Sequence, residues 1–211
     1  MHYRIHELTD DLVDDYAHAH IEFLNTTYAH LVGADYGRAR RAEFADRVTE
    51  LRDDLAEARS AIAQGREPHR RHWVALSPWG AVIGVACSGE GIGSWEEGAV
   101  GEAWRPPSVT FTLDHLYLAP GVQGIGLGRR LLETAVPPGR GAYLWVIRDN
   151  SRAVAFYARH GFLPDGLDAV AGESWGRLPM RRLLRPAAQG SDPGAEEVQD
   201  RTEERPSVER G

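Results

Sequence analysis

Residues 113–132 read LDHLYLAPGVQGIGLGRRLL, and this stretch decides the predicted fold. It begins with residues that favour β-structure, and from Leu127 onward it has the character of a helix. Between the two lies a turn in which Gly124, Gly126 and Gly128 alternate with other residues. Main-chain N–H groups converge at such a turn, and glycine lets an anion approach them closely. The stretch therefore predicts an anion-binding turn between a strand and a helix.

Three kinds of turn share these glycines. A phosphate-binding nucleotide loop requires Gly-Lys-Ser or Gly-Lys-Thr, and the chain has no lysine, so this kind is excluded. A dinucleotide fingerprint requires Gly-x-Gly-x-x-Gly with an acidic residue about twenty positions later, which neither the alternating glycines nor the context of Asp149 supplies. On the glycines alone, a connection without function stays open.

Composition excludes several classes of protein. The 211 residues are enough for one well-filled α/β domain, and the single cysteine excludes an internal disulfide. The formal net charge of −7 argues against broad binding to nucleic-acid phosphates. The longest apolar stretch, residues 81–87, is far below the roughly 20 residues of a membrane span, and residues 1–7 contain no apolar block of a signal peptide. We therefore expect a cytoplasmic protein that binds neither nucleic acid nor a membrane.

Hydrophobic periodicity predicts the other elements. Helices are expected from Leu12 to about Gly33 and over residues 44–62, where the apolar residues step alternately by four and three. Further helices are expected at 127–136 and 151–160, and strands at 4–6, 72–76, 81–86, 109–118, 141–147 and 177–184. Residues 187–211 contain almost nothing apolar and are predicted to be a disordered acidic tail.

Two blocks of residues resemble a known family. The first comprises Leu116-Tyr117-Leu118-x-Pro120, Gln123-x-x-Gly126-x-Gly128 and Leu131-Leu132, and it resembles the acetyl-CoA loop of the GNAT acetyltransferase superfamily. The second block follows at the family's spacing and comprises Leu144-Trp145-Val146, Asn150, Ala153, Phe156-Tyr157 and Gly161-Phe162. The resemblance covers residues 72–162 and is fainter over the N-terminal helices.

The resemblance implies an α/β fold with a mixed, mostly antiparallel twisted sheet, flanked by helices, whose central strands splay apart. It also implies one acetyltransferase domain over residues 1–186. Within it, residues 1–66 form a helical substrate-side part, and residues 72–184 form a sheet core with the acetyl-CoA site.

Binding roles follow from the resemblance residue by residue. Main-chain N–H groups after Gln123 are expected to hold the pyrophosphate of coenzyme A, namely those of Gly124, Ile125, Gly126, Leu127, Gly128 and Arg129. The backbone of Leu116, Tyr117 and Leu118 is expected to pair with the pantetheine arm, with the Leu118 N–H polarising the thioester carbonyl. Asn150 is expected to contact the pantetheine or to cap the next helix.

Catalytic roles are also implied. Tyr157 lies where the family often has a general acid, and Asp114 matches a position of the general base. Strand alternation places Thr112 and Asp114 on one face and His115 on the other. Glu102, Glu173 and bound water stay open as other bases.

The implied function is transfer of an acetyl group from acetyl-CoA to a primary amine of a small molecule or peptide, by direct attack in a ternary complex. A non-catalytic acetyl-CoA sensor is the alternative, and a longer acyl donor also stays open. The histidines lack the spacing of a metal site, so no metal is expected. Homodimers are common in the family, so a homodimer is one of the assemblies that stay open, and Trp95 and Trp104 are candidates for the border of an acceptor pocket.

Overall fold

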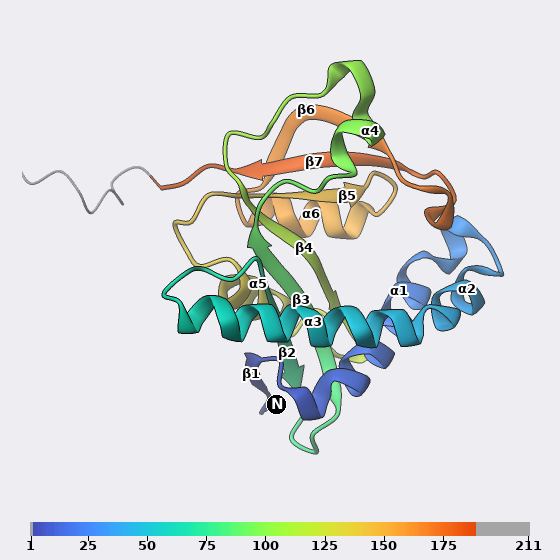
Figure 1. Cartoon of the computed structure of the whole chain (residues 1–211). Coiled ribbons are helices and arrows are strands. Elements are labelled where there is room, and N and C mark those ends of the chain that lie inside the picture. The colour runs from blue at the N-terminus through green and yellow to red at the C-terminus, as the bar shows by residue number, and fades with distance from the viewer. Residues whose placement is uncertain (1, 189–211) are drawn as a thin grey trace, which may run out of the picture.

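The computed structural model describes residues 2–188, in which seven strands form one sheet in the order β1-β2-β3-β4-β5-β7-β6 (Figure 1). Neighbouring strands are antiparallel except for β4 and β5, which are parallel. The strands are β1 (Arg4–Glu7), β2 (Arg70–Leu76), β3 (Val82–Glu90), β4 (Phe111–Leu118), β5 (Ala142–Ile147), β6 (Leu163–Val170) and β7 (Pro179–Arg185).

Helices cover both faces of the sheet. α1 (Val13–Val32) and α3 (Phe44–Ala63) pack on one face, with α3 in front of the strands in Figure 1. α5 (Leu127–Ala135) and α6 (Ser151–Arg159) pack on the other face, where Leu131, Leu132 and Phe162 form the centre of a buried cluster. The remaining helices are α2 (Tyr36–Ala42) and α4 (Glu96–Val100). This arrangement confirms the predicted fold class.

The apolar residues that recur every three or four positions along α3 explain how that helix packs against the sheet. Val48, Leu51, Leu55 and Ala58 are all buried, as their spacing on one face requires. Ile62 is the exception, because the last turn buries Ala61 and leaves Ile62 51% exposed.

One strand and two α-helices were not predicted from the sequence. β6 contains Pro164 and Gly166, two residues that argue against a strand. It is tolerated because β6 lies at the edge of the sheet and its pairing with β7 shifts register between Pro164 and Asp168. α2 and α4 have only seven and five residues, too few for a clear helical period.

The central strands splay apart, as the resemblance implied. β4 pairs with β3 along most of its length, yet it pairs with β5 at one position, Thr112 opposite Tyr143. Beyond that position the edge of β4 that faces β5 is open. The fold thus leaves main-chain donors and acceptors free in the middle of a sheet.

A bulge in β4 corrects the expected orientation of His115. The pairing with β3 shifts between Cys87, opposite His115, and Ser88, opposite Leu113, so Asp114 is the extra residue. Strict alternation therefore fails at this point. Asp114 and His115 both contact the group of side chains around Cys87 and Tyr16, instead of lying on opposite faces.

The predicted tail falls almost entirely outside the described residues, which include only Ala187 and Ala188 of it. Within residues 2–188, no helix combines the length and apolar character needed to cross a bilayer.

A buried ion pair joins β7 to the start of β6. Arg182 is 1% exposed, and its guanidinium donates to Asp165 at 2.7 Å and to the carbonyl of Arg105 at 3.0 Å. Aromatic rings of Trp104, Tyr143 and Trp145 surround it. Removing one partner of such a pair leaves a buried charge without compensation.

We expect Asp165→Ala to lower the free energy of unfolding by about 3 kcal/mol, the cost of an unpaired buried guanidinium. Asp168→Ala is the matched control, because this carboxylate is half-exposed and its pairs with Arg148 and Arg181 lie at the surface. Its loss should cost less than about 1 kcal/mol. Urea unfolding measures both values, and equal losses would contradict the prediction.

Candidate active site

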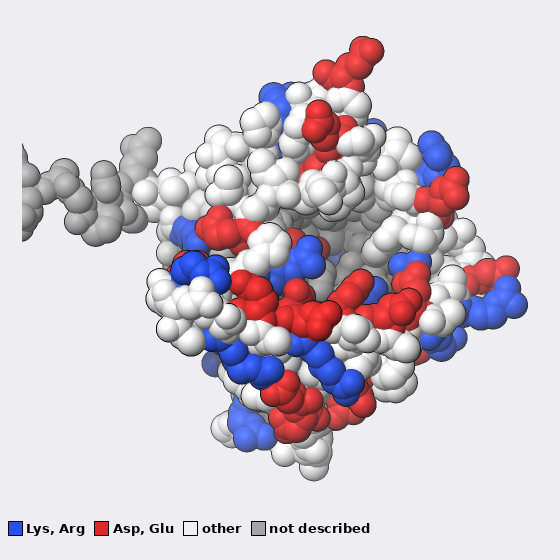
Figure 2. Space-filling view, viewed as in Figure 1, with Lys and Arg blue, Asp and Glu red and all other residues white. Residues whose placement is uncertain are grey.

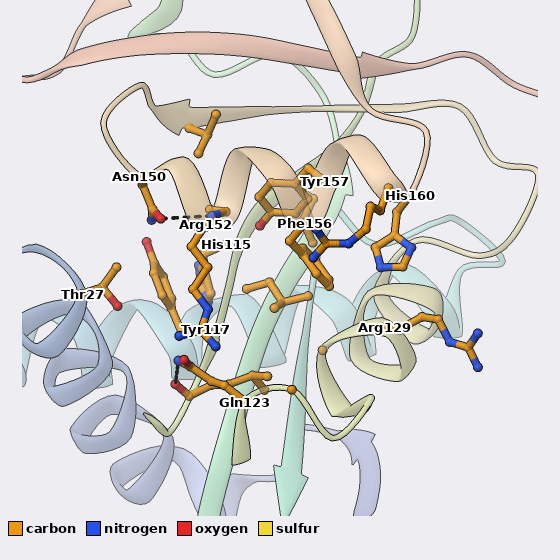
Figure 3. A pocket seen from close by; sticks show the side chains of 18 of the residues that line it. Thr27, His115, Tyr117, Gln123, Arg129, Asn150, Arg152, Phe156, Tyr157 and His160 are labelled. Carbon is orange, nitrogen blue, oxygen red and sulfur yellow. Dashed lines mark hydrogen bonds between the residues drawn. The ribbon is translucent and has the colours of Figure 1, made fainter. Parts of the chain in front are cut away.

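A cavity of about 390 Å³ lies where β4 and β5 diverge (Figure 3). Its walls come from β4, the glycine-rich turn, α6 and the C-terminal half of α1. We call it the first cavity. It brings together eleven of the thirteen predicted site residues: Asp114, Leu116, Tyr117, Leu118, Gln123, Gly124, Gly126, Gly128, Arg129, Asn150 and Tyr157.

The other two residues, Ile125 and Leu127, do not line the cavity with their side chains. Ile125 is 48% exposed, while Leu127 is fully buried against the core. The role predicted for both was a main-chain contact, which does not depend on where their side chains point.

The turn has the geometry that an anion site requires. Gly124 and Gly126 both have φ of +86°, a conformation that residues with a Cβ rarely adopt. The N–H of Arg130 donates to the carbonyl of Gly126 and closes the first turn of α5. The main-chain N–H groups that precede Arg130 lie at the positive end of α5 and have no carbonyl acceptor within the helix. They are therefore suited to bind a phosphate.

The open edge of β4 presents the Leu118 N–H to the first cavity. The N–H of Ala119 donates to Ile83 on β3 at 3.0 Å, and donors alternate between the two sides along an antiparallel strand. Leu118 consequently directs its N–H and C=O away from β3. Its carbonyl accepts a hydrogen bond from Gln123 at 3.2 Å, which connects the strand to the turn.

Asn150 caps α6. Its Oδ1 accepts the N–H of Ala153 at 3.1 Å, and its Nδ2 donates to the hydroxyl of Tyr28 at 3.3 Å. Of the two roles expected from the sequence, the structure therefore shows the cap. The same residue also joins α6 to α1 across the first cavity.

Tyr157 lies on α6 with its ring against Phe156 and Phe162 and is 8% exposed. Burial, with a smaller contribution from Tyr28, raises the pKa of its hydroxyl above the ordinary value. The hydroxyl therefore carries its proton across the whole neutral range and is a donor toward the first cavity.

Asp114 lies at the bulge and lines the first cavity. Its Oδ2 forms an ion pair with Arg70 Nε at 3.1 Å and accepts the S–H of Cys87 at 3.5 Å. Both contacts involve the same oxygen. Within the described part of the chain, Oδ1 remains available to a ligand.

A buried polar network lies beside Asp114. The hydroxyl of Tyr16 donates to the carbonyl of Ala86 at 2.9 Å, so its single proton is used there. His115 Nε2, 2.9 Å away, must then donate to the Tyr16 oxygen, which leaves Nδ1 of His115 as the acceptor nitrogen. His72 lies 3.4 Å from the same hydroxyl and pairs with Asp54 at 2.8 Å.

Burial, followed by the nearby His20, His72, Arg47 and Arg70, lowers the pKa of His115 well below its ordinary value. The pKa of His20, which stacks on His115 at 4.1 Å, is lowered by burial and by Arg47 and His72. Both rings are neutral at pH 7. His115 is therefore a second candidate for the base beside Asp114, and the assumption of strict strand alternation had placed it on the other face.

Sequence reasoning missed several residues of the site. Tyr16, Asp54 and His72 come from α1, α3 and β2, and no local pattern connects them to β4. Arg152, Arg159 and His160 on or next to α6 also line the first cavity, and the two arginines add positive charge near the turn. Helical spacing counted from the Asn150 cap is a signal that could have found these three residues. Glu102 and Glu173, kept open as bases, do not line the first cavity.

Comparison with known proteins supports the geometry. A family model described as an acetyltransferase (GNAT) domain matches residues 68–164. The N-alpha-acetyltransferase RimI of Mycobacterium tuberculosis is 31% identical over 102 residues, which are 47% of this chain and 56% of the relative. The chain thus spans little more than half the length of this curated relative.

Solved structures share the fold at low identity. PaiA N-acetyltransferase from Thermoplasma acidophilum, in complex with coenzyme A, superposes with a TM-score of 0.58 at 16% identity, over 86% of this chain and 98% of that one. A Corynebacterium glutamicum protein described as histone acetyltransferase HPA2 and related acetyltransferase gives 0.56 at 20% identity, over 91% and 100%. Residues 68–164 are thus similar to a GNAT acetyltransferase domain, in sequence to the family model and in fold to these solved structures.

Proposed function

We propose that this protein transfers an acetyl group from acetyl-CoA to a primary amine by direct attack in a ternary complex. The observation that carries the proposal is the open edge of β4, which ends at the glycine-rich turn. Coenzyme A has amide groups along its pantetheine arm and phosphates at the end of that arm. It therefore matches an open strand edge that is followed by a phosphate-binding turn. The PaiA structure with coenzyme A and the name of the RimI relative support the same carrier and an amine acceptor.

The chain's own residues would divide the work along the first cavity. The turn from Gly124 to Arg129 holds the phosphates, and the edge of β4 holds the arm in the manner of an added strand. The N–H of Leu118 donates to the thioester oxygen as negative charge develops there. Acetyl-CoA supplies the activated acetyl group.

In the transfer, the amine nitrogen bonds to the acetyl carbon and the carbon–sulfur bond breaks. The nitrogen loses a proton to Asp114, whose Oδ1 forms no hydrogen bond or ion pair with the described residues. The sulfur receives a proton from Tyr157, whose raised pKa keeps the proton on the hydroxyl until the thiolate forms. Residues 2–188 hold no cluster of ligands suited to a metal ion.

Acetyl-CoA binding tests the site itself. At about one hundred times its Kd, acetyl-CoA should raise the free energy of unfolding by about 2.7 kcal/mol, seen as a thermal shift. Gly126→Ala should abolish most of this shift, because φ of +86° is strained for alanine. Gly121→Ala is the matched control, since it lies in the same turn with no atom near its Cβ position and without a positive φ. A shift that Gly126→Ala leaves intact would contradict this site.

Tyr157→Phe distinguishes an enzyme from an acetyl-CoA sensor. We expect release of free thiol in the presence of an amine to fall at least tenfold, within the usual range for loss of a general acid. The Kd for acetyl-CoA should change little, because the ring and its packing remain. Binding without turnover in the wild type, over a broad amine panel, would favour the sensor.

The base is tested by Asp114→Asn and His115→Gln. If Asp114 accepts the proton, its variant should lose about 100-fold in kcat/KM, whereas His115→Gln should lose no more than about threefold. The lowered pKa of His115 keeps the ring neutral well below pH 6.5, so His115 would hold activity to lower pH than an ordinary histidine. A large loss in His115→Gln alone would assign the base to His115 in place of Asp114.

A further inference from the structure

A second cavity of about 190 Å³ opens on the face covered by α1 and α3. Its walls come from the connection between β3 and α4 and from the facing side chains of β4 and β5. It shares three residues with the first cavity, namely Leu113, Asp114 and Trp145. The two cavities therefore meet where the strands part, with Asp114 at the junction.

The second cavity contains a carboxylate without a cation. Glu96 is 2% exposed, and its Oε1 accepts the hydroxyl of Tyr143 at 2.7 Å and the N–H of Gly93 at 3.0 Å. Its Oε2 is buried without a partner among the described residues. Burial of a carboxylate is costly unless a cation or enough donors compensate it.

The other charges of the cavity wall are already paired. Asp114 pairs with Arg70, and Glu90 pairs with Arg140 at 2.5 Å. Glu96 forms no ion pair within the part of the chain that the structure describes, so a cation from outside would complete the site. A small cationic ligand suits a cavity below the 300–1,000 Å³ that is usual for larger ligands.

Aromatic side chains and the surrounding charge favour the same ligand. Trp95 and Trp145 both line the second cavity, and their ring centroids are 5.7 Å apart. The faces of aromatic rings attract cations. Figure 2 shows this side of the molecule hollowed between α3 and α4, with acidic side chains prominent along the rim that α3 forms. Such a rim raises the local concentration of a cationic solute.

We propose that the second cavity is the acceptor subsite, and that it selects a small acceptor carrying a second cationic nitrogen. The Glu96 carboxylate holds this second nitrogen, while the nitrogen to be acetylated lies at Asp114, at the junction with the first cavity. This inference rests on the proposed transferase function and adds the class of acceptor. The helix α4, inserted between β3 and β4, is the element that supplies the selectivity.

The test compares amines of equal chain length on the wild-type protein. We expect kcat/KM for 1,4-diaminobutane to exceed that for 1-aminobutane and for 4-amino-1-butanol at least tenfold. Equal values for the three amines would overturn the proposal without any variant. This comparison of amines therefore tests the proposal even if a substitution of Glu96 prevents folding.

Glu96→Gln then identifies the residue, because glutamine keeps an oxygen for Tyr143 and Gly93 and removes the charge. It should reduce the preference for the diamine to less than about threefold, by lowering kcat/KM for the diamine more than that for 1-aminobutane, and it should leave the acetyl-CoA thermal shift unchanged. Glu97→Gln is the matched control, since Glu97 is the next residue of α4 and is exposed. An equal loss for diamine and monoamine in Glu96→Gln would contradict the assignment.

Calorimetry separates failure of the subsite from failure of the transferase. If no amine supports thiol release, titration of 1,4-diaminobutane into the protein with coenzyme A still reports on the second cavity. Binding that weakens at least tenfold in Glu96→Gln supports the subsite. Absence of binding to the wild type overturns it.

Discussion

The divergence of β4 from β5 is the constraint on which the rest of the structure depends. Two parallel neighbours that pair at one position leave a row of main-chain donors and acceptors inside the sheet. Each such group, if buried without a partner, costs about 1–3 kcal/mol. The opening persists because β3 pairs with the opposite edge of β4, while β7 pairs with β5 along its whole length. The frame around the gap is thus complete, and the gap itself is free to accept a ligand.

The same divergence collects the chemical groups. The turn after β4 begins α5, and the chain after β5 begins α6, so both helices start at the end of the sheet where the strands are farthest from their last pair. The bulge at Asp114 marks the other end, where the strands still meet, and it presents a carboxylate and an imidazole together. The groups that we propose for phosphate, amide and amine recognition consequently follow one another along β4 and the turn after it.

Buried polar groups specify how the layers dock. Tyr16 connects α1 to β3 and β4, and His72 connects β2 to α3 through Asp54. Arg182 connects β7 to the segment around Arg105 and to Asp165. Such networks add little stability over an apolar core, but a misdocked helix would leave their members unpaired. Glu96 differs from these groups, because one of its oxygens has no partner among residues 2–188.

Much of the architecture could be read from the chain. Alternation and helical spacing predict local structure directly, because side-chain direction repeats with the backbone, and the helices at Val13–Val32 and Phe44–Ala63 were found in this way. The glycine-rich turn could also be predicted, because the positive φ at Gly124 and Gly126 depends on the residue type at each single position. β6 was missed because only its edge position makes Pro164 and Gly166 tolerable.

The sequence by itself determined the side of the site that we propose for the coenzyme, since the turn and the residues of β4 that precede it are contiguous along the chain. Only the tertiary structure decided the side that we propose for the amine. The bulge broke the alternation that separated His115 from Asp114, packing across the sheet brought Tyr16 to His115 from a distant segment, and the connection between β3 and β4 placed Glu96 in the same cavity wall as Asp114. Contacts between distant segments depend on how strands and helices pack, and no local period of the sequence records them.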